Sequence, residues 1–232
     1  MTEPTPIVLI PGLLCSPSLY AAQLPALWQF GPVTIADHRR DETMAAIAKR
    51  ILAAAPPRFA LAGLSMGGYI AYAILHAAPE RVTRLALLDT SARADLPEQS
   101  ERRKAQIELA RAGKLGDVAE TLWPLFVHKN RHEDAALKKG ILQMAEDTGA
   151  DAFIRQQMAI MSRPDSRPDL PGIKCPTLVL VGEGDQLTPP KLSEEIAGAI
   201  PNSRLVVIPG SGHLTTLERP DSVNKALTEW MR

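Results

Sequence analysis

The 232-residue sequence has little of the features that mark several large protein classes. Basic and acidic residues balance at 26 each, so no general affinity for nucleic acid or for an anionic membrane surface is expected. The two cysteines, Cys15 and Cys175, are too few for a disulfide scaffold, and we interpret them as reduced thiols of a cytoplasmic protein. No apolar run approaches the ~20 residues of a membrane span. The apolar start has no basic residues ahead of it, unlike a signal peptide.

Apolar residues make up 45% of the chain and gather in short runs, which predicts a folded core. Continuous apolar runs bounded by glycine and proline are typical of strands buried on both faces. Helical patterns alternate with several of them, at residues 43–55, 66–78, 190–200 and 220–231. The alternation predicts an α/β fold with a mostly parallel sheet of about six strands, flanked by helices. The predicted strands are residues 7–10, 33–36, 59–64, 84–88, 177–181 and 204–208.

The alternation fails between about residues 91 and 171, where only helical patterns follow one another. They cover residues 97–112, 115–128 with an interruption near Pro124, 131–147 and 150–162. We therefore predict a core built from residues 1–91 and 171–232, with an all-helical insertion over residues 92–170.

A G-x-S-x-G motif, Gly63-Leu64-Ser65-Met66-Gly67, lies between the third predicted strand and the helix that follows it. In this context a tight strand-to-helix turn holds the serine in a strained conformation, and glycines beside it let backbones pass closely. The hydroxyl of Ser65 is then exposed at the carboxyl edge of the sheet, where ligands bind in open α/β folds. Ser65 is therefore the predicted nucleophile, against the alternative of an ordinary glycine-rich loop.

A serine hydroxyl needs a base to take its proton. His213 follows the last predicted strand, which places it at the same sheet edge as Ser65 and makes it the predicted base. His38, after the second strand, is the second candidate. His128 and His132 have the i, i+4 spacing of metal ligands, but no third ligand accompanies them in a known pattern, so no metal site is predicted.

The imidazole needs a carboxylate to orient it. Asp185 lies in Gly182-Glu183-Gly184-Asp185, directly after the fifth predicted strand and again at the carboxyl edge. Asp89, at the end of the fourth strand, is the competing acid. We prefer Asp185 because glycines open its loop.

The anion formed when a serine attacks an acyl group needs at least two hydrogen-bond donors. One is predicted to be the N–H of Met66, the residue after the nucleophile. The other should come from the loop after the first strand, Pro11-Gly12-Leu13-Leu14, with Leu13 preferred and Leu14 as the alternative.

Four motifs together resemble the α/β-hydrolase superfamily, and most of all its small bacterial carboxylesterases and enol-lactonases. They are P-G-L-L at residues 11–14, G-L-S-M-G-G at 63–68, G-E-G-D at 182–185 followed by L-T-P, and G-S-G-H at 210–213. The resemblance covers nearly the whole chain except the insertion. It implies the α/β-hydrolase fold, with the insertion forming a cap over the active site.

Two departures from the family pattern affect the expected substrate side. Pro11 stands where many relatives have the histidine of H-G, and residues 37–41 read D-H-R-R-D in place of R-G-x-G-x-S. Arg39, Arg40 or an arginine of the insertion could hold a substrate carboxylate. The predicted substrate pocket comprises Leu14, Trp123, Phe126, Met158, Leu187 and Leu214.

These patterns predict an enzyme that hydrolyses a small carboxylic ester or lactone without a metal or organic cofactor. The same triad also serves C–C bond hydrolysis, acyl transfer and perhydrolysis, and the fold does not distinguish among them. A non-catalytic binder of small ligands on this scaffold is the alternative from another class. The oligomeric state stays open, and no nucleic-acid or membrane partner is expected.

Overall fold

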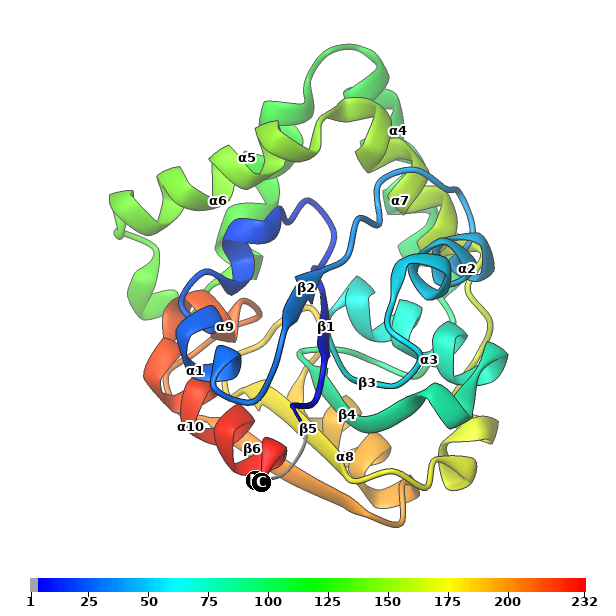
Figure 1. The fold of residues 1–232 in the computed structure, drawn as a ribbon. Coiled ribbons are helices and arrows are strands. Elements are labelled where there is room, and N and C mark those ends of the chain that lie inside the picture. The colour runs from blue at the N-terminus through cyan, green and yellow to red at the C-terminus, as the bar shows by residue number, and fades with distance from the viewer. Residues whose placement is uncertain (1–3) are drawn as a thin grey trace.

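Six parallel strands form one sheet in the computed structural model, which describes residues 4–232 (Figure 1). The order across the sheet is β2-β1-β3-β4-β5-β6, and every neighbouring pair is parallel. This confirms the predicted fold class. Residues 1–3, which the predicted core included, lie outside the described residues. The strands are β1 (Ile7–Ile10), β2 (Val33–Ile35), β3 (Phe59–Leu64), β4 (Val82–Leu88), β5 (Thr177–Gly182) and β6 (Ser203–Ile208).

Helices cover both faces of the sheet, which explains why the inner strands β1, β3 and β5 are buried along their whole length. Successive side chains of a strand point to opposite faces, so Ile7 and Leu9 join one core cluster while Val8 and Ile10 join the other. The first cluster packs against α1 (Leu24–Trp28) and α10 (Pro220–Met231). The second packs against α2 (Met44–Ala54), α3 (Met66–Ala77) and α8 (Pro190–Ala199).

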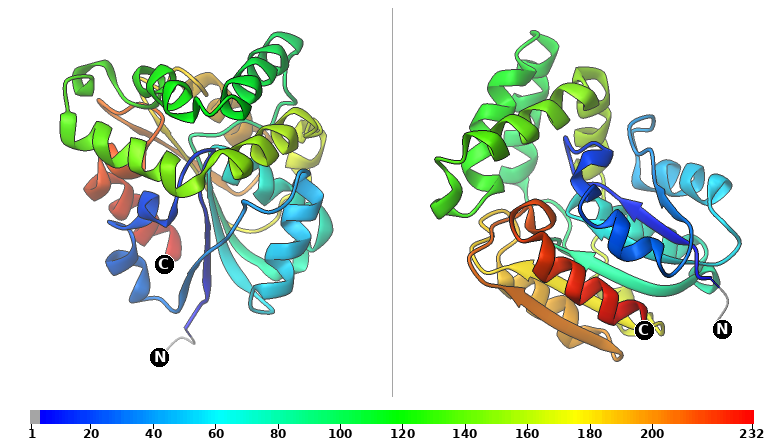
Figure 2. Two further views of the ribbon diagram at one scale, coloured as in Figure 1. Left: turned by 90° about the horizontal axis from the view of Figure 1, so that it is seen from above. Right: turned by 60° about the vertical axis from the view of Figure 1, so that its left-hand side comes forward.

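Four further helices follow β4 and precede β5, and we call them the cap helices. Figures 1 and 2 show them together over one end of the sheet. They are α4 (Pro97–Arg111), α5 (Leu115–Phe126), α6 (Ala135–Thr148) and α7 (Ala150–Met161). Their apolar residues, such as Trp123, Met144 and Phe153, belong to the same core cluster as α1 and α10. None of the helices of residues 4–232 is long and apolar enough to cross a lipid bilayer.

Two predictions about the cap helices were wrong. The interruption expected at Pro124 does not occur, because α5 continues through it to Phe126. Proline removes one helical hydrogen bond, but this turn is held by the burial of Leu122, Trp123 and Phe126. The third helix begins at Ala135 and not at 131, because the Asp134 side chain accepts a hydrogen bond from the Leu137 N–H at 2.9 Å and caps the helix there.

The structure also contains short elements that periodicity did not indicate, since a single turn carries too few residues to show a period. Besides α1, they are a four-residue α9 (Thr215–Glu218) and the 3-10 turns η1 (Pro17–Tyr20), η2 (Pro79–Arg81), η3 (Lys129–Arg131) and η4 (Arg167–Gly172).

Candidate active site

Ser65 occupies the turn between β3 and α3 in a conformation that few non-glycine residues adopt. Its backbone has φ 54° and ψ −113°, a strain that costs about 1–3 kcal/mol and has to be held by its surroundings. The Ser65 N–H donates to the Leu88 carbonyl at 2.9 Å, and its own carbonyl accepts from the Thr90 hydroxyl at 2.7 Å. A Cβ at Gly67 would overlap the Ile10 carbonyl, so this turn requires glycine there.

His213 and Asp185 are hydrogen-bonded in the interior. The distance from His213 Nδ1 to Asp185 Oδ2 is 2.8 Å, and both side chains are almost completely buried. The Thr188 hydroxyl also donates to Oδ2, at 2.7 Å, while the N–H groups of Leu187 and Thr188 donate to Oδ1 at 2.8 and 2.9 Å. Because the carboxylate only accepts, the proton of the neutral imidazole lies on Nδ1 and Nε2 is left as an acceptor.

Asp89, the competing acid, lies nearby but has other partners. Its Oδ1 accepts from the Gly182 N–H at 2.9 Å and its Oδ2 accepts from the Thr215 hydroxyl. Within residues 4–232 it makes no hydrogen bond to His213. Complete burial raises the pKa of Asp89 well above its ordinary value, and the charge of Asp185 raises it further. Asp89 therefore joins β4, β5 and α9, and does not orient the imidazole.

Ser65 and His213 line one cavity of about 510 Å³ at the carboxyl edge of the sheet, beneath α4 and α5. We call it the Ser65 cavity. The Phe126 ring stacks on the imidazole with the ring centres 6.2 Å apart and the planes inclined by 13°. No hydrogen bond joins the hydroxyl and the imidazole in the described chain, and such contacts commonly tighten only when a substrate binds.

Glu218 holds the loop that carries His213, and the sequence analysis missed it. Its Oε1 accepts from the Gly212 N–H at 2.6 Å and the Ser211 hydroxyl at 3.2 Å, and its Oε2 accepts from the His128 N–H at 2.8 Å. Burial raises the pKa of this carboxyl. No sequence signal marked Glu218, because it lies in the single turn α9. No group of three or more potential metal ligands occurs in residues 4–232.

Two backbone N–H groups beside Ser65 have no acceptor in the described part of the chain, those of Leu13 and Met66. Leu13 lines the Ser65 cavity, and Met66 begins α3 directly after the serine. The alternative donor is engaged elsewhere, because the Leu14 N–H donates to Gln156 Oε1 at 3.3 Å. The Leu13 N–H is thus unpaired on the cavity wall, and the Met66 N–H is unpaired beside the serine, whereas that of Leu14 is engaged.

His38, the second candidate base, lies outside the lining of the Ser65 cavity. Its Nε2 is 3.0 Å from the Gly12 carbonyl oxygen and 3.1 Å from Gln156 Nε2. Burial lowers the pKa of His38, so the ring is neutral near pH 7. His38 and the fully buried Gln156 of α7 together contact the loop after β1. Nothing in the sequence marked Gln156 as part of this contact.

Three of the predicted pocket residues line the Ser65 cavity, namely Phe126, Leu187 and Leu214. The other three, Leu14, Trp123 and Met158, do not. The Trp123 and Leu14 side chains are buried in the first core cluster instead. On α7 the cavity is reached by Ile160, and Met158, which lies about 200° away around the helix, is only half-buried elsewhere.

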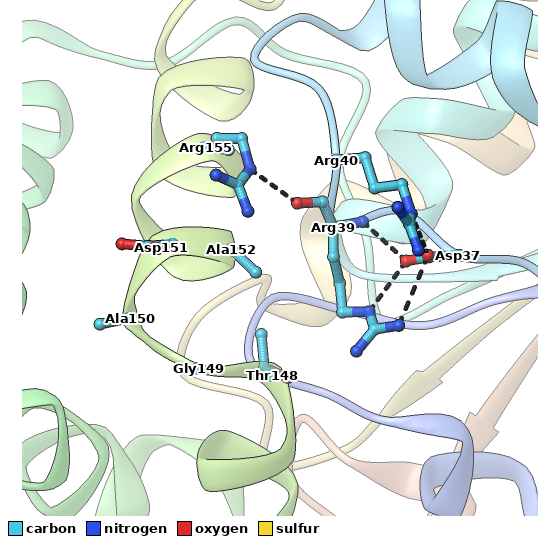
Figure 3. Close-up of a pocket in the computed structure, with 9 residues that line it drawn as sticks. All are labelled: Asp37, Arg39, Arg40, Thr148, Gly149, Ala150, Asp151, Ala152 and Arg155. Atoms are coloured by element: carbon cyan, nitrogen blue, oxygen red, sulfur yellow. Dashed lines mark hydrogen bonds and ion pairs between the residues drawn. The ribbon is translucent and has the colours of Figure 1, made fainter.

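The arginines predicted to meet a substrate carboxylate are divided between two places. Figure 3 shows Arg39 and Arg40 gathered on Asp37, beside Arg155 of α7, around a second cavity of about 540 Å³. Burial would raise the pKa of Asp37, but hydrogen bonds from Arg39 and Arg40 outweigh it and lower that pKa well below its usual range. This second cavity shares no lining residue with the Ser65 cavity. Cap arginines, including Arg103, line the Ser65 cavity instead.

Comparisons with known proteins agree with the fold and the motif context. The chain is similar to a thermophilic esterase from Thermogutta terrifontis, whose structure was determined with malate bound, at 32% identity and TM-score 0.89 over 98% of this chain and 89% of that one. It is similar to the enol-lactonase of Burkholderia xenovorans LB400 at 26% identity and TM-score 0.90, over 99% and 92% of the two chains. A Mycobacterium tuberculosis protein that carries the name of a non-heme bromoperoxidase is 33% identical over 181 residues, 76% of this chain and 68% of that protein. The model of the alpha/beta hydrolase family matches residues 7–226, and the chain belongs to that family.

Proposed function

We propose that this protein hydrolyses a small carboxylic ester or lactone through an acyl-enzyme, with Ser65 as nucleophile, His213 as base and Asp185 as the residue that orients the imidazole. The observation that carries the proposal is the buried 2.8 Å hydrogen bond between Asp185 and His213, at a cavity that the strained Ser65 also lines. This combination supplies a nucleophile, a base and an orienting acid in the roles that acyl transfer needs.

In the first half-reaction, the Ser65 oxygen bonds to the acyl carbon and its proton passes to Nε2 of His213. The protonated imidazole then gives that proton to the departing alkoxide, and the alcohol leaves. In the second half-reaction, water gives a proton to Nε2 and attacks the acyl carbon, and the Ser65–acyl bond breaks as the serine regains a proton. The carboxylic acid is released and the enzyme is unchanged.

The tetrahedral intermediates carry negative charge on the former carbonyl oxygen. The N–H groups of Leu13 and Met66, which have no acceptor in the described chain, would donate to it. Loss of one such donor typically raises the barrier by ~3 kcal/mol. The cap helices would exclude water and shape the acyl and alcohol subsites, because α4 and α5 line the cavity above Ser65.

The relatives support a reaction at an acyl group. An esterase and an enol-lactonase both share the whole fold at TM-scores of 0.89 and 0.90. Ester and lactone hydrolysis use the same steps, since a lactone differs only in that its alcohol stays attached to the acyl group.

A second candidate reaction is perhydrolysis, which the similarity to a protein named as a bromoperoxidase favours. Here hydrogen peroxide would replace water in the second half-reaction and release a peracid. Peracid formation during turnover of an acetate ester in hydrogen peroxide would support this candidate. If no peracid forms, hydrolysis is the only one of the two reactions that remains.

A fluorophosphonate probe and p-nitrophenyl acetate test the proposal. The wild-type protein should be labelled and should turn over the ester, and the Ser65→Ala variant should do neither. Ser18→Ala, which changes an exposed serine of η1, is the matched control and should behave as wild type. Equal labelling and turnover of wild type and Ser65→Ala would refute the nucleophile, and a folded wild type that does neither would favour a ligand-binding protein.

A further inference from the structure

The wall of the Ser65 cavity carries charge of one sign. Four arginines line it, Arg93, Arg102, Arg103 and Arg163, and no aspartate, glutamate or lysine is among its lining residues in the described chain. A concave wall of low dielectric constant concentrates such a field and attracts anions. The charge of the cavity therefore bears on which substrates enter it.

Two of these arginines lie on a face of α4 that is polar where a covering helix is normally apolar. The residues Gln99, Arg102, Arg103 and Gln106 all line the cavity. They are spaced i, i+3, i+4 and i+7, which places them on one side of the helix. The neighbouring α5 presents mainly apolar residues to the same cavity. The cavity thus has an apolar wall and a basic wall.

The positive charge of the basic wall is only partly balanced by the carboxylate that lies behind it. Arg163 donates to Asp95 Oδ1 at 2.7 Å and Arg103 donates to Asp95 Oδ2 at 2.9 Å. Exposure of the side chains is 6% for Arg163, 19% for Arg103 and 1% for Asp95. One buried carboxylate therefore serves two guanidinium groups, although buried charges are usually balanced.

Hydrogen-bond donors remain free on the same wall. Arg103 uses Nε on Asp95 and Nη1 on Gln157, and its Nη2 has no acceptor in residues 4–232. Arg102 forms no ion pair or side-chain hydrogen bond within the described chain and is exposed where it lines the cavity. Arg93 differs, because Glu195 binds it at 2.9 and 3.0 Å. The uncompensated charge thus belongs to α4.

We propose that the substrate carries a carboxylate in addition to its ester or lactone group, and that Arg102 and Arg103 bind this carboxylate. The inference rests on the proposed function, because it assigns the second end of a substrate whose acyl carbon lies at Ser65. A guanidinium binds a carboxylate through a pair of parallel hydrogen bonds, for which the whole of Arg102 is available, and Arg103 Nη2 can donate one further hydrogen bond. The negative charge of the substrate carboxylate would also balance the excess positive charge of Arg103 and Arg163 around Asp95.

Charge-matched substrate pairs test this assignment. Mono-p-nitrophenyl glutarate and its methyl ester share an acyl chain and a leaving group and differ in one charge. For an anionic alcohol part, 4-acetoxybenzoate and its methyl ester form the corresponding pair. In at least one pair, wild type should show a kcat/KM at least 10-fold higher for the anion, mainly through KM, and added salt should reduce the preference because it screens exposed charges.

Arg102→Gln should lower that anion-to-neutral ratio by about 10- to 100-fold, the range expected for one lost charged partner. Arg103→Lys keeps the charge but loses the planar guanidinium, and it should lower the anion-to-neutral ratio less than Arg103→Gln does. Arg111→Gln is the matched control, because Arg111 also lies on α4 but pairs with Glu108 at the surface. Its ratio should equal that of wild type.

The outcomes separate this inference from the proposed function. If the probe labels Ser65 and the neutral esters are hydrolysed, but neither pair shows an anion preference, the carboxylate site is refuted and the hydrolase stands. A preference that survives Arg102→Gln and Arg103→Gln in folded protein also refutes these residues as its source. If Ser65 is neither labelled nor needed for turnover, the proposed function itself fails.

Discussion

Replacing Asp185 with asparagine should remove the base without removing the fold. Asparagine keeps one acceptor oxygen, which can take the place of Oδ1 and still receive the N–H groups of Leu187 and Thr188 at 2.8 and 2.9 Å. Its NH2 group then replaces Oδ2 and points its hydrogens at His213 Nδ1. Nδ1 has to accept, so the imidazole proton moves to Nε2, the atom that we propose receives the Ser65 proton.

The expected loss follows from that tautomer change. The corresponding substitution in the reference serine protease lowers kcat about 10⁴-fold, which is about 5.5 kcal/mol of activation free energy at 1.36 kcal/mol per factor of ten. The hydrogen bonds of His213 and the Thr188 hydroxyl to Oδ2 lose their charged acceptor, but the NH2 group can donate to both partners, so stability should fall by only about 1–3 kcal/mol. Activity should therefore disappear in protein whose thermal transition is still cooperative.

Asp89→Asn is the matched control, because it changes the other buried aspartate at the same sheet edge. Its oxygen can still accept from the Gly182 N–H, and the Thr215 hydroxyl can rotate to accept from the new NH2 group. Turnover of p-nitrophenyl acetate should stay within about 10-fold of wild type. A crippled Asp89→Asn beside an active Asp185→Asn would refute the assignment of the acid.

The same control predicts a pH dependence of stability. The pKa of Asp89 is raised in the folded protein, so the folded state holds this proton more tightly than the unfolded chain. Wild-type stability should then fall as pH rises from the unfolded pKa, ~3.9, through the folded one. Asp89→Asn has no such titration, so its free energy of unfolding in urea, relative to that of wild type, should increase as pH rises through that range. An advantage that shrinks as pH rises would contradict the raised pKa.

Three further changes test how the site is held. Gln156→Leu should leave the Leu14 N–H without its acceptor, lower the free energy of unfolding in urea by about 1–3 kcal/mol, and lower kcat more than it changes KM. Gln156→Glu keeps an acceptor and should recover part of kcat. Equal kinetics for the two variants would argue against this contact. Burial raises the pKa of the Cys15 thiol to about 12, so Cys175→Ala protein should react with a disulfide reagent at pH 8 only after unfolding, and fast reaction in the native state would disprove the burial. Gly67→Ala should lower the free energy of unfolding by about 1–3 kcal/mol, because the added Cβ would overlap the Ile10 carbonyl. Gly140→Ala, in open space within α6, should raise it by about 0.5–1 kcal/mol. Matching shifts in the thermal transitions of the two variants would refute the close packing of Gly67 against Ile10.

Most of the fold was predictable because its signals are local. The strands were found within two residues at each end, since apolar runs such as Phe59–Leu64 are bounded by glycine and proline. The helix boundary at Asp134 was missed, because a capping side chain competes with a helical pattern that starts earlier. Pro124 was misread for the opposite reason, since burial of its neighbours on α5 overrides the proline.

The residues of the candidate site likewise fall into those that local patterns predicted and those that they missed. Ser65, Asp89, Asp185 and His213 each follow a strand, so a parallel sheet brings all four to one edge, but their order along the chain does not tell Asp185 from Asp89. Glu218 and Gln156 were missed because each contacts a distant segment, Glu218 at a separation of 90 residues and Gln156 at 142. Only three of the six predicted pocket residues line the Ser65 cavity, because periodicity defines a helix face but not what that face contacts.

The sequence by itself determined the strand–helix alternation, the insertion between β4 and β5, and the three residues whose places after strands bring them to the carboxyl edge, because these depend on local patterns and on the geometry of parallel sheets. Only the tertiary structure decided that Asp185 and not Asp89 contacts the imidazole, and that the Leu13 amide and not that of Leu14 is free. It also decided that the arginines lining the Ser65 cavity are Arg93, Arg102, Arg103 and Arg163, and not Arg39 or Arg40. These outcomes depend on the packing of segments far apart in the chain, and no local pattern encodes a distance between two such segments.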